Sequence, residues 1–549
     1  MNRLVVPGLA SGPVLALDEP ISFWGGVDPA TGRIVDAFHP QRGECVSGCV
    51  LVLPGTRGSC TGSGVLLELA LTGRAPAALV FRDAEDVATT GALVAAELFG
   101  LALPVVRLEP GAFAQVARAD DLRIEGATLT ADGEAIPLRA GGADALELSP
   151  QDRAMLDGAE GPAPAFAMRV LVALAAVQGA PRLIPITRAH IDGCIHAAPA
   201  FLRFAEAMVA MGAKVRVPTT TNAISVDREG WRAQGVAEAV GAPAARLADA
   251  YVEMGARPSF TCAPYLLEDA PAEGEAVAWG ESNAVIYANS VLGARTAKLP
   301  DFMDLCAAVT GRVPLAGMYA EAARAPQMTV AVDWPEGAED AIWPLLGWLI
   351  GRAAPDRVPL VTGLEAADRS PDDLKALCAA FGTTSAAPML RLASGAEERP
   401  GPVVRIDRDS LRAGWDRLAA GPEAVDLVAI GSPHASLAEM RRLADLLDGA
   451  RCAIDCLVTV GRDVARVASR EGVMPRLLQA GVRVVPDLCW CSISEPVFPP
   501  AAREVLTNSG KYAHYGPGLH GRRVRLAPLD ACAEAACTGR APTARPPWL

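Results

Sequence analysis

The chain beyond residue 148 alternates short apolar runs with longer segments of helical periodicity, and polar residues follow most of the apolar runs. The run at 183–186 precedes a polar loop at 189–196, and the run V-R-V-P, 215–218, precedes T-T-T-N. Such alternation predicts parallel strands, because a helix must return the chain before the next strand can pair in parallel. The predicted fold class is therefore α/β with mostly parallel sheets, and ligands are expected at the carboxyl ends of the strands.

Polar side chains gather after several of these predicted strands, in A-H-I-D-G-C-I-H (189–196), V-P-T-T-T-N (217–222) and W-G-E-S-N (279–283). A single histidine or asparagine is more often structural, but polar groups repeated at successive strand ends favour one shared site. The candidate substrate-binding residues in these segments are His190, Asp192, Thr220, Thr221, Asn222, Glu281, Ser282 and Asn283.

A second candidate region runs from residue 485 to residue 515. A mostly apolar run, 482–485, leads into a turn-rich loop that carries Cys489 and Cys491. Thiolates are ligands for iron–sulfur clusters or zinc. Further along, T-N-S-G-K offers amide, hydroxyl and ammonium donors that suit a carboxylate or a phosphate. The candidate anion ligands are Asn508, Ser509, Gly510 and Lys511.

The N-terminal part of the chain contains a loop dense in Gly, Ser and Thr, G-T-R-G-S-C-T-G-S-G, at 55–64. A strand is predicted before it and an apolar helix after it, so the loop exposes backbone N–H groups together with small hydroxyls. Ser63 is either a helix cap or a functional hydroxyl, and Ser59 is the alternative hydroxyl. The spacing lacks the Gly-Lys-Ser or Gly-Lys-Thr of a nucleotide-binding loop.

The pattern divides the chain into a small domain, 1–135, a linker, 136–147, and a large region, 148–549, of two or more α/β lobes. The linker lies within a stretch, 123–147, that is rich in Gly, Ala, Asp and Thr. Ser149 followed by Pro150 predicts the capped start of a helix where the large region opens.

Charge and composition limit the partners. The formal net charge of −13 disfavours a nucleic acid as the main partner, because a basic face is needed to release counterions from phosphates. The sequence contains no run of eighteen uninterrupted apolar residues, so no membrane-spanning helix is predicted. The 13 cysteines, without an evident export signal, suggest free thiols in a reducing cytoplasm. The expected partner is a small-molecule substrate, and the oligomeric state is left open.

Together these motifs resemble those of aconitase X, the hydro-lyase branch of the aconitase superfamily, over nearly the full length. The first part is similar to the small subunit of that family and the rest to its large subunit. The resemblance implies an aconitase-like fold with a small swivelling domain fused to a multi-lobed α/β region. It rests on F-W-G-G-V-D-P, G-S-C-T-G-S-G-V-L, H-I-D-G-C, V-P-T-T-T-N, T-C-A-P-Y, E-S-N-A-V-I-Y-A-N-S-V-L-G-A-R-T, D-L-C-A-A-V-T-G-R, P-H-A-S and T-N-S-G-K-Y-A-H-Y.

Because the chain is of the fused kind, the resemblance implies dehydration of cis-3-hydroxy-L-proline to a pyrroline carboxylate. Mevalonate 5-phosphate, the substrate of two-chain archaeal members, is the alternative within the class. A different class of function, a non-catalytic iron-responsive RNA binder, is disfavoured by the acidic charge.

The resemblance also implies site roles. Ser63, or alternatively Ser59, would be the base, with Lys511 or neighbouring donors lowering its pKa. An iron–sulfur cluster, 2Fe-2S in preference to 3Fe-4S or 4Fe-4S, would act as a Lewis acid or as a structural anchor. Cys306 and Cys489 match the ligand motifs. The third ligand stays open, because Ser432 stands where two-chain relatives carry a cysteine; the candidates are Cys491, Cys262 and His434.

Overall fold

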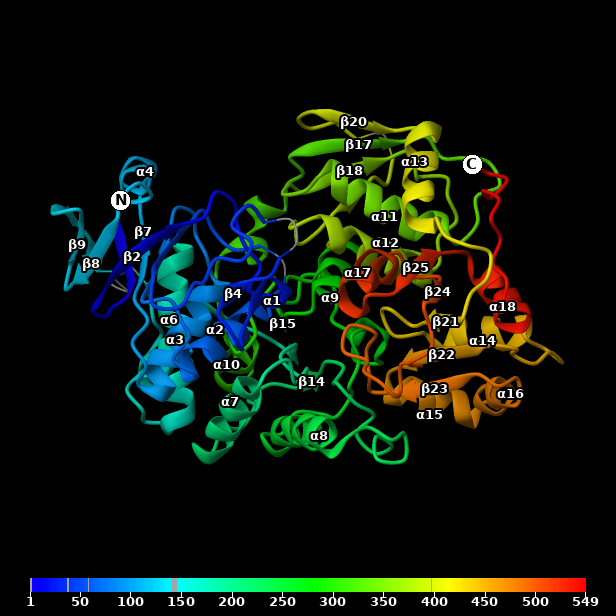
Figure 1. The fold of residues 1–549 in the computed structure, drawn as a ribbon, viewed down its shortest axis with the longest axis horizontal. Helices are drawn as coiled ribbons and strands as arrows, with labels where there is room; N and C mark the ends of the chain where they lie inside the picture. The colour runs from blue at the N-terminus through cyan, green and yellow to red at the C-terminus, as the bar shows by residue number, and fades with distance from the viewer. Residues whose placement is uncertain (1, 37–38, 58, 141–145, 396) are drawn as a thin grey trace.

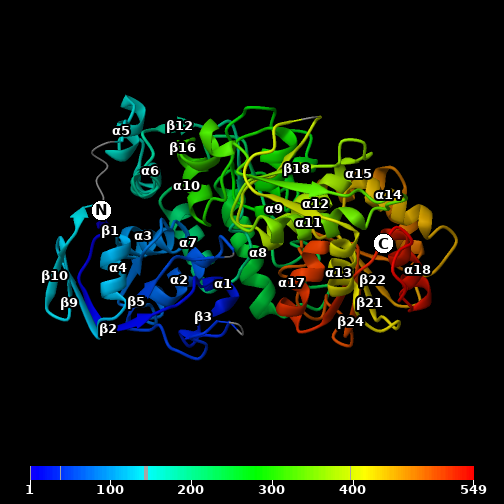
Figure 2. The same cartoon turned by 90° about the horizontal axis from the view of Figure 1, so that it is seen from above.

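The computed structural model describes residues 2–36, 39–57, 59–140, 146–395 and 397–549. The molecule is elongated, with a small domain at one end and a larger region at the other, and its two termini lie far apart along the long axis (Figure 1). A view from above shows the same separation (Figure 2). Within the described residues, no helix is both long and apolar enough to cross a membrane.

The small domain is built on a nine-stranded mixed sheet in the order β10-β9-β8-β2-β5-β6-β7-β1-β11. Strands β1 (Arg3–Val6), β8 (Asp121–Glu125) and β9 (Thr128–Ala131) lie outside its centre. Its centre is parallel, and every residue of the apolar strands V-L-V-L and A-L-V-F is buried there. Helices cover these central strands, as expected for a parallel sheet whose connections cross over its faces. The central strands are β2 (Ala10–Ala16), β5 (Val50–Leu53), β6 (Ala78–Phe81) and β7 (Val105–Arg107), and the first two crossing helices are α2 (Gly62–Leu71) and α3 (Val87–Phe99).

The predicted linker begins too early. Residues 134–137 and 139–140 form β10 and β11 of the small domain's sheet, so the domain extends to Ala140. The sequence of this stretch resembles a loop because its strands are short and are joined by turns at Gly126 and Gly133, which have positive φ angles of 55° and 88°. Strands β8 and β9 nevertheless bury alternate residues. Residues 141–145 of the expected linker lie outside the described residues.

The first part of the large region holds a short parallel sheet in which β13 (Ala189–Ile191) lies between β14 (Thr219–Thr221) and β15 (Ala278–Trp279). All three strands end at one edge, so the residues that follow them converge. A separate antiparallel pair, β12 (Leu183–Pro185) with β16 (Arg312–Pro314), lies nearby. The surrounding helices are α6 (Pro162–Gln178), α7 (Pro199–Ala210), α8 (Glu238–Glu253) and α10 (Met303–Thr310).

The rest of the large region contains two further sheets, and all strands in both are parallel. The predicted α/β class with mostly parallel sheets is therefore confirmed. Helix α12 (Pro371–Thr384) packs on α11 (Ile342–Ala353) of its own lobe and on α17 (Gly510–His520) of the last lobe (Figure 1). The strand orders are β19 (Arg391–Leu392)-β18 (Pro359–Thr362)-β17 (Met328–Val332)-β20 (Val403–Ile406) and β23 (Arg483–Pro486)-β22 (Asp455–Val460)-β21 (Leu427–Ile430)-β24 (Glu504–Thr507)-β25 (Arg523–Leu526).

The start of α5 (Pro150–Leu156) and the end of α10 both have the capping residues that the sequence patterns predict. The Ser149 hydroxyl accepts a hydrogen bond from the N–H of Asp152, and the Asp152 carboxylate accepts one from the N–H of Ser149, so a capping box begins α5. Helix α10 ends at Gly311, whose positive φ of 69° suits a residue without a side chain. The predicted helix start at Ser149 is confirmed.

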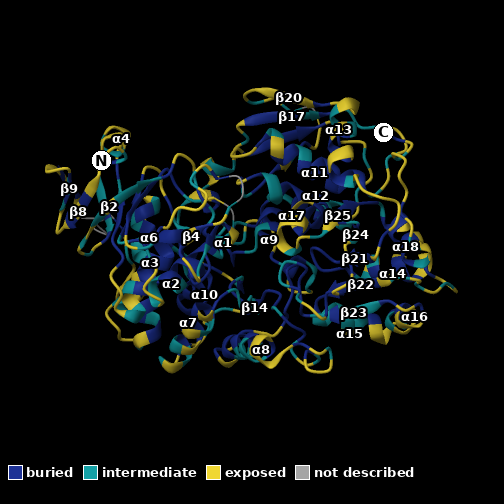
Figure 3. Ribbon diagram, in the orientation of Figure 1, coloured by how far each residue is buried: buried dark blue, intermediate teal, exposed yellow. Residues whose placement is uncertain are grey.

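A continuous core crosses the junction between the small domain and the large region (Figure 3). The rings of Phe204 and Phe302 lie 4.3 Å apart, and Phe201 lies 5.5 Å from Phe302. A Cβ on Gly64 of α2 would lie 2.0 Å from Phe201 of α7. The small domain therefore docks through direct helix-to-ring contact, with no room for a side chain at residue 64.

Candidate active site

Glu281 is the centre of the predicted site. It follows β15 at the start of α9 (Ser282–Tyr287), and its carboxylate accepts hydrogen bonds from Lys511 Nζ at 2.8 Å and from Asn283 at 2.6 Å. Asn222, which follows β14, donates a third at 3.3 Å. Burial by itself raises the pKa of Glu281, but Lys511 and the two amides outweigh it and hold that pKa at about 2. Glu281 and Lys511 therefore form a buried ion pair at neutral pH.

Three aspartates extend this site into a cluster of carboxylates, formed by Asp192, Glu281, Asp301 and Asp304. Asp192 follows β13, and its Oδ1 accepts a hydrogen bond from Asn222. Asp304 accepts the backbone N–H of Asp192 at 2.5 Å and that of Leu305 at 2.6 Å. Burial, reinforced by the neighbouring carboxylates, raises the pKa of Asp192 and of Asp301 well above the usual range.

The predicted histidine and threonines lie beside this carboxylate cluster. His190 is fully buried, and its Nδ1 lies 2.8 Å from the Thr220 hydroxyl. Burial lowers the pKa of His190 to about 4, so the ring is neutral. Thr221 instead donates to the Arg257 carbonyl at 3.1 Å and helps to fix the strand edge.

Three thiols form a second group, the thiol cluster, from Cys262, Cys489 and Cys491. Hydrogen bonding with Cys262, followed by burial, raises the pKa of Cys489, whereas Cys491 and Lys511 lower it. The charge of Lys511 also acts on Cys491, so the thiol cluster and the Glu281 ion pair are neighbours.

His434 positions the thiol cluster. Its backbone N–H donates to Cys262 Sγ at 3.3 Å, and its ring nitrogens lie 3.3 Å from the Thr261 hydroxyl and 2.8 Å from the Leu488 carbonyl. Both ring nitrogens are engaged, so His434 ties the Cys262 loop to the Cys489 loop instead of offering a nitrogen to a metal.

Cys306 does not join the thiol cluster. It lies on α10 in the core that the small domain shares with the large region. Burial raises the pKa of its thiol, with a smaller contribution from Asp304. Cys306 and Cys489 were expected to be ligands of the same cluster. The structure does not bring them together, because α10 directs Cys306 into the apolar core.

Backbone strain marks the same site. Among the described residues, four other than glycine have positive φ angles, and three of them lie within two residues of the two clusters. These are Phe260 (φ 38°), two before Cys262, Phe302 (φ 79°), after Asp301, and Asp487 (φ 68°), two before Cys489. Such conformations cost free energy and concentrate where geometry serves a function.

The loop of the small domain reaches this site directly. The Ser63 hydroxyl is completely buried and lies 3.0 Å from the Cys60 carbonyl and 3.1 Å from the Asp301 carbonyl. It lies in the first turn of α2 and does not cap it, since Thr61 holds the cap position. Ser59 donates instead to the Thr61 hydroxyl at 3.0 Å. Ser63 is therefore the predicted serine that meets the large region.

Lys298 is a site residue that the sequence patterns did not single out. Its Nζ donates to the Ser385 carbonyl at 3.3 Å, and its charge interacts with Cys60 and Glu281. Burial lowers the pKa of Lys298 to about 8. The one feature of the sequence that could have drawn attention to Lys298 is the scarcity of lysine, since only four of the 50 basic residues are lysines.

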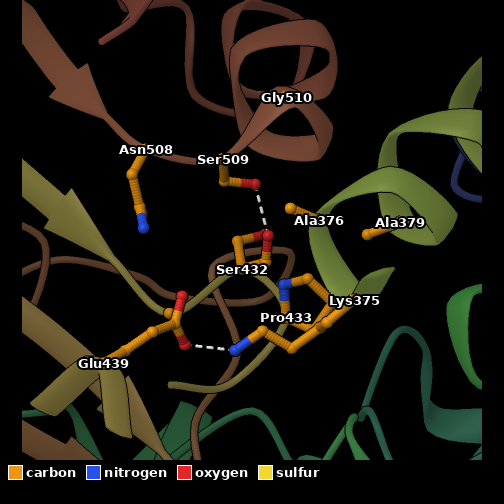
Figure 4. Close-up of a pocket in the computed structure, with 10 residues that line it drawn as sticks. Lys375, Ala376, Ala379, Ser432, Pro433, Glu439, Asn508, Ser509 and Gly510 are labelled. Carbon is orange, nitrogen blue, oxygen red and sulfur yellow. Dashed lines mark hydrogen bonds and ion pairs between the residues drawn. The ribbon is translucent and has the colours of Figure 1, made fainter. Parts of the chain in front are cut away.

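The remaining predicted residues lie around a separate pocket between α12 and the loop at Gly431 (Figure 4). Asn508, Ser509 and Gly510 line it together with the buried ion pair of Lys375 and Glu439. Ser509 caps α17 by accepting the N–H of Tyr512 at 3.0 Å. A Cβ on Gly510 would lie 2.9 Å from Pro344. Among the predicted donors of this segment, only Lys511 reaches the carboxylate cluster in the described structure. Ser282 is the first residue of α9.

Comparison with known families covers almost the whole chain. Residues 1–131 match the aconitase X swivel domain, and residues 145–322, 326–416 and 425–538 match the first, second and third aconitase X domains. The chain belongs to the aconitase X family. The expected aconitase-like fold with a fused swivel domain is thereby confirmed, and an aconitase X crystal structure from Thermococcus kodakaraensis in its holo-form agrees, with a TM-score of 0.64 at 28% identity over 71% of this chain and 100% of that one.

Other aconitase X relatives differ in how much of the chain they match. The cis-3-hydroxy-L-proline dehydratase of Pseudomonas aeruginosa is 47% identical over 100% of this chain and 98% of its own. The protein of the same name from Hypocrea jecorina is 44% identical over 99% of this chain and 96% of its own. The phosphomevalonate dehydratase large subunit of Methanothermobacter thermautotrophicus is 32% identical over 69% of this chain and 96% of its own.

Proposed function

We propose that this aconitase X chain is a hydro-lyase that removes water from cis-3-hydroxy-L-proline and yields Δ1-pyrroline-2-carboxylate. The observation that carries the proposal is the end-to-end similarity, 47% and 44% identity, to two dehydratases named for that substrate. The phosphomevalonate dehydratase large subunit is more distant, at 32% identity. A buried site with ionised and neutral groups side by side supports the chemistry, because removing a carbon-bound proton needs a base in a water-poor pocket.

We assign the proton transfer to Ser63 with Lys298. A serine hydroxyl must lose its own proton to take one from carbon, and the two carbonyls that it contacts cannot accept a proton. Lys298 lies beside Cys60, three residues before Ser63, and its pKa of about 8 leaves part of it neutral. The neutral amine accepts the serine proton while Ser63 Oγ takes the proton from Cα, as in other serine–lysine pairs. Lys298 thus takes the role that the sequence suggested for Lys511, which is held by Glu281.

An iron–sulfur cluster fits the thiol cluster as a set of donors. Cys262, Cys489 and Cys491 present three soft ligands beside the Lys511 ammonium. Among the described residues, no group of three or more His, Cys, Asp or Glu side chains is placed to hold a single metal ion, so the support for a cluster is the chemistry of the thiols alone. The 2Fe-2S form remains our proposal. When bound, the iron supplies a Lewis acid for the leaving hydroxyl.

The test is an assay of protein purified without oxygen. We expect loss of cis-3-hydroxy-L-proline with formation of Δ1-pyrroline-2-carboxylate, and visible absorption from thiolate-to-iron charge transfer. Turnover of mevalonate 5-phosphate in its place would overturn the substrate assignment. A colourless, inactive protein that binds RNA in low salt would move the chain to the class of non-catalytic relatives.

A further inference from the structure

Among the described residues, three of the four carboxylates in the carboxylate cluster have no cationic partner. Glu281 is paired with Lys511, and Asp304 is satisfied by backbone N–H groups. Asp192 has the amide of Asn222. Asp301 is 1% exposed, yet its Oδ1 has no hydrogen-bond partner within the described parts of the chain. A buried carboxylate oxygen left in this state costs free energy unless a ligand provides a donor.

A second unpartnered atom lies at the same place. His190 Nε2 is buried and has no hydrogen-bond partner in the part of the chain that the structure describes. The His190 ring lies beside the Glu281 carboxylate and the Asn222 amide, which also binds Asp192. The imidazole nitrogen of His190 and the carboxylate oxygen of Asp301 are thus two separate unpartnered atoms in one place. Such a pair is expected where polar groups are arranged around a ligand.

The charge and geometry of these groups select an ammonium ion. Burial and the neighbouring carboxylates of Glu281 and Asp304 raise the pKa of both Asp192 and Asp301, so a positive group placed beside them would be attracted. No three acidic, imidazole or thiol side chains in the described residues are arranged for a metal ion. A secondary ammonium has two N–H donors at fixed angles and can bridge two carboxylates by charge-assisted hydrogen bonds.

We propose that Asp192 and Asp301 bind the ring ammonium of the amino-acid substrate and so select a cyclic amino acid over a hydroxy acid that lacks nitrogen. The inference rests on the proposed function, since it names how that substrate is recognised. It also places the reacting carbon. The ring nitrogen is bonded to Cα, and Ser63 Oγ lies 3.1 Å from the Asp301 backbone carbonyl, so an ammonium on the Asp301 carboxylate brings Cα to the proposed base.

The test compares two ligands of nearly the same shape by isothermal titration calorimetry: L-proline and tetrahydrofuran-2-carboxylate, in which oxygen replaces the ring N–H groups. We expect wild-type protein to bind L-proline about 10- to 100-fold more tightly, the range for hydrogen bonds to charged groups. Asp301→Asn and Asp192→Asn should each remove most of this preference. For cis-3-hydroxy-L-proline, both should raise KM more than they lower kcat.

The matched control is Asp416→Asn, which removes a carboxylate paired with Arg545 at the surface and should keep the wild-type preference. Circular dichroism reports folding, and if Asp301→Asn does not fold, Asp192→Asn decides the question. Equal binding of the two ligands by wild type, or an unchanged preference in the folded variants, overturns the inference. A wild type that prefers L-proline but does not dehydrate the hydroxyproline overturns only the proposed function.

Discussion

Two of the four lysines, Lys375 and Lys511, are buried and Lys298 is partly buried, and their neighbours decide their charge. Burial opposes the charge of Lys375 and of Lys511, but nearby carboxylates outweigh it and raise the pKa of both. Lys298 contacts a backbone carbonyl instead of a carboxylate, so burial dominates and lowers its pKa to about 8. The same residue type thus serves as a fixed cation at one place and as a proton acceptor at another.

We expect Lys298→Met to lower kcat by about 100-fold or more, because the base that takes the serine proton is lost. In wild type, the lowered pKa means that Lys298 is protonated below about pH 8 and neutral above it. Hence kcat/KM should rise with pH and level off above about 8, and this rise should disappear in the variant. A pH–rate profile measures it, with Lys214→Met, an exposed lysine, as the control. A variant with an unchanged profile would contradict the assignment.

The thiol cluster gives a second test at the scale of single residues. Serine substitution of Cys262, Cys489 or Cys491 should remove most of the bound iron and visible absorption, and should lower activity at least about tenfold, because a hydroxyl is a poor ligand for iron. Cys306→Ser should keep iron and colour, since Cys306 lies in the core. Iron analysis and absorption spectra measure both. Loss of iron from Cys306→Ser with retention in Cys491→Ser would reverse our choice of ligands.

At the scale of elements, the contact of α2 with α7 aligns the two halves of the site. The helix that carries Ser63 packs against the ring of Phe201 at Gly64, the next residue. The backbone around Gly64 therefore sets both the docking of the small domain and the position of the proposed base. A small residue here allows close approach, as at other tight helix contacts.

Gly64→Ala should lower the free energy of unfolding by about 1–3 kcal/mol, because the added Cβ would overlap the Phe201 ring. Activity should fall with it, since the clash moves Ser63 away from Asp301. Thermal and urea unfolding measure the first effect, and steady-state kinetics the second. Gly111→Ala, in α4 (Pro110–Val116) with open space around its Cβ, is the matched control and should not destabilise the protein. Recovery in Gly64→Ala/Phe201→Leu would support the cause, and a stable, active Gly64→Ala would contradict it.

At the scale of the whole molecule, a shared core joins the small domain to the large region. Residues of α2 and α3 pack with α6, α7 and α10 in a single cluster of buried side chains. In relatives named phosphomevalonate dehydratase, separate large and small subunits match the corresponding parts of this chain. We therefore expect the contacts of the shared core to hold the two parts together without a covalent link.

A chain divided into co-expressed fragments 1–140 and 146–549 should reassemble and keep much of its activity, because burying the core residues of the junction stabilises the complex. Co-purification through a tag on the larger fragment measures assembly, and the dehydration assay measures function. The same experiment with Gly64→Ala in the small fragment should give weaker association. Fragments that are folded by circular dichroism but purify separately would contradict this prediction.

Much of the fold could be predicted from the sequence because it depends on local pattern. Apolar runs such as V-L-V-L became buried parallel strands, and Ser149 with Pro150 began a helix. The end of the small domain was misjudged, because the short strands around Gly126 and Gly133 look like a loop until their pairing is seen. Of the site, the strand-end residues Asp192, Asn222 and Glu281 do converge as predicted.

The sequence by itself determined the α/β architecture, the membership in aconitase X and the segments that form the site, since each depends on neighbours along the chain. Tertiary structure alone decided which thiols meet and that Lys511 pairs with Glu281 while Lys298 lies beside Cys60. It also decided that one Asp301 oxygen has no hydrogen-bond partner among the residues that the structure describes. These outcomes depend on distance and desolvation between segments up to hundreds of residues apart, and neither quantity is a property of any local stretch of sequence.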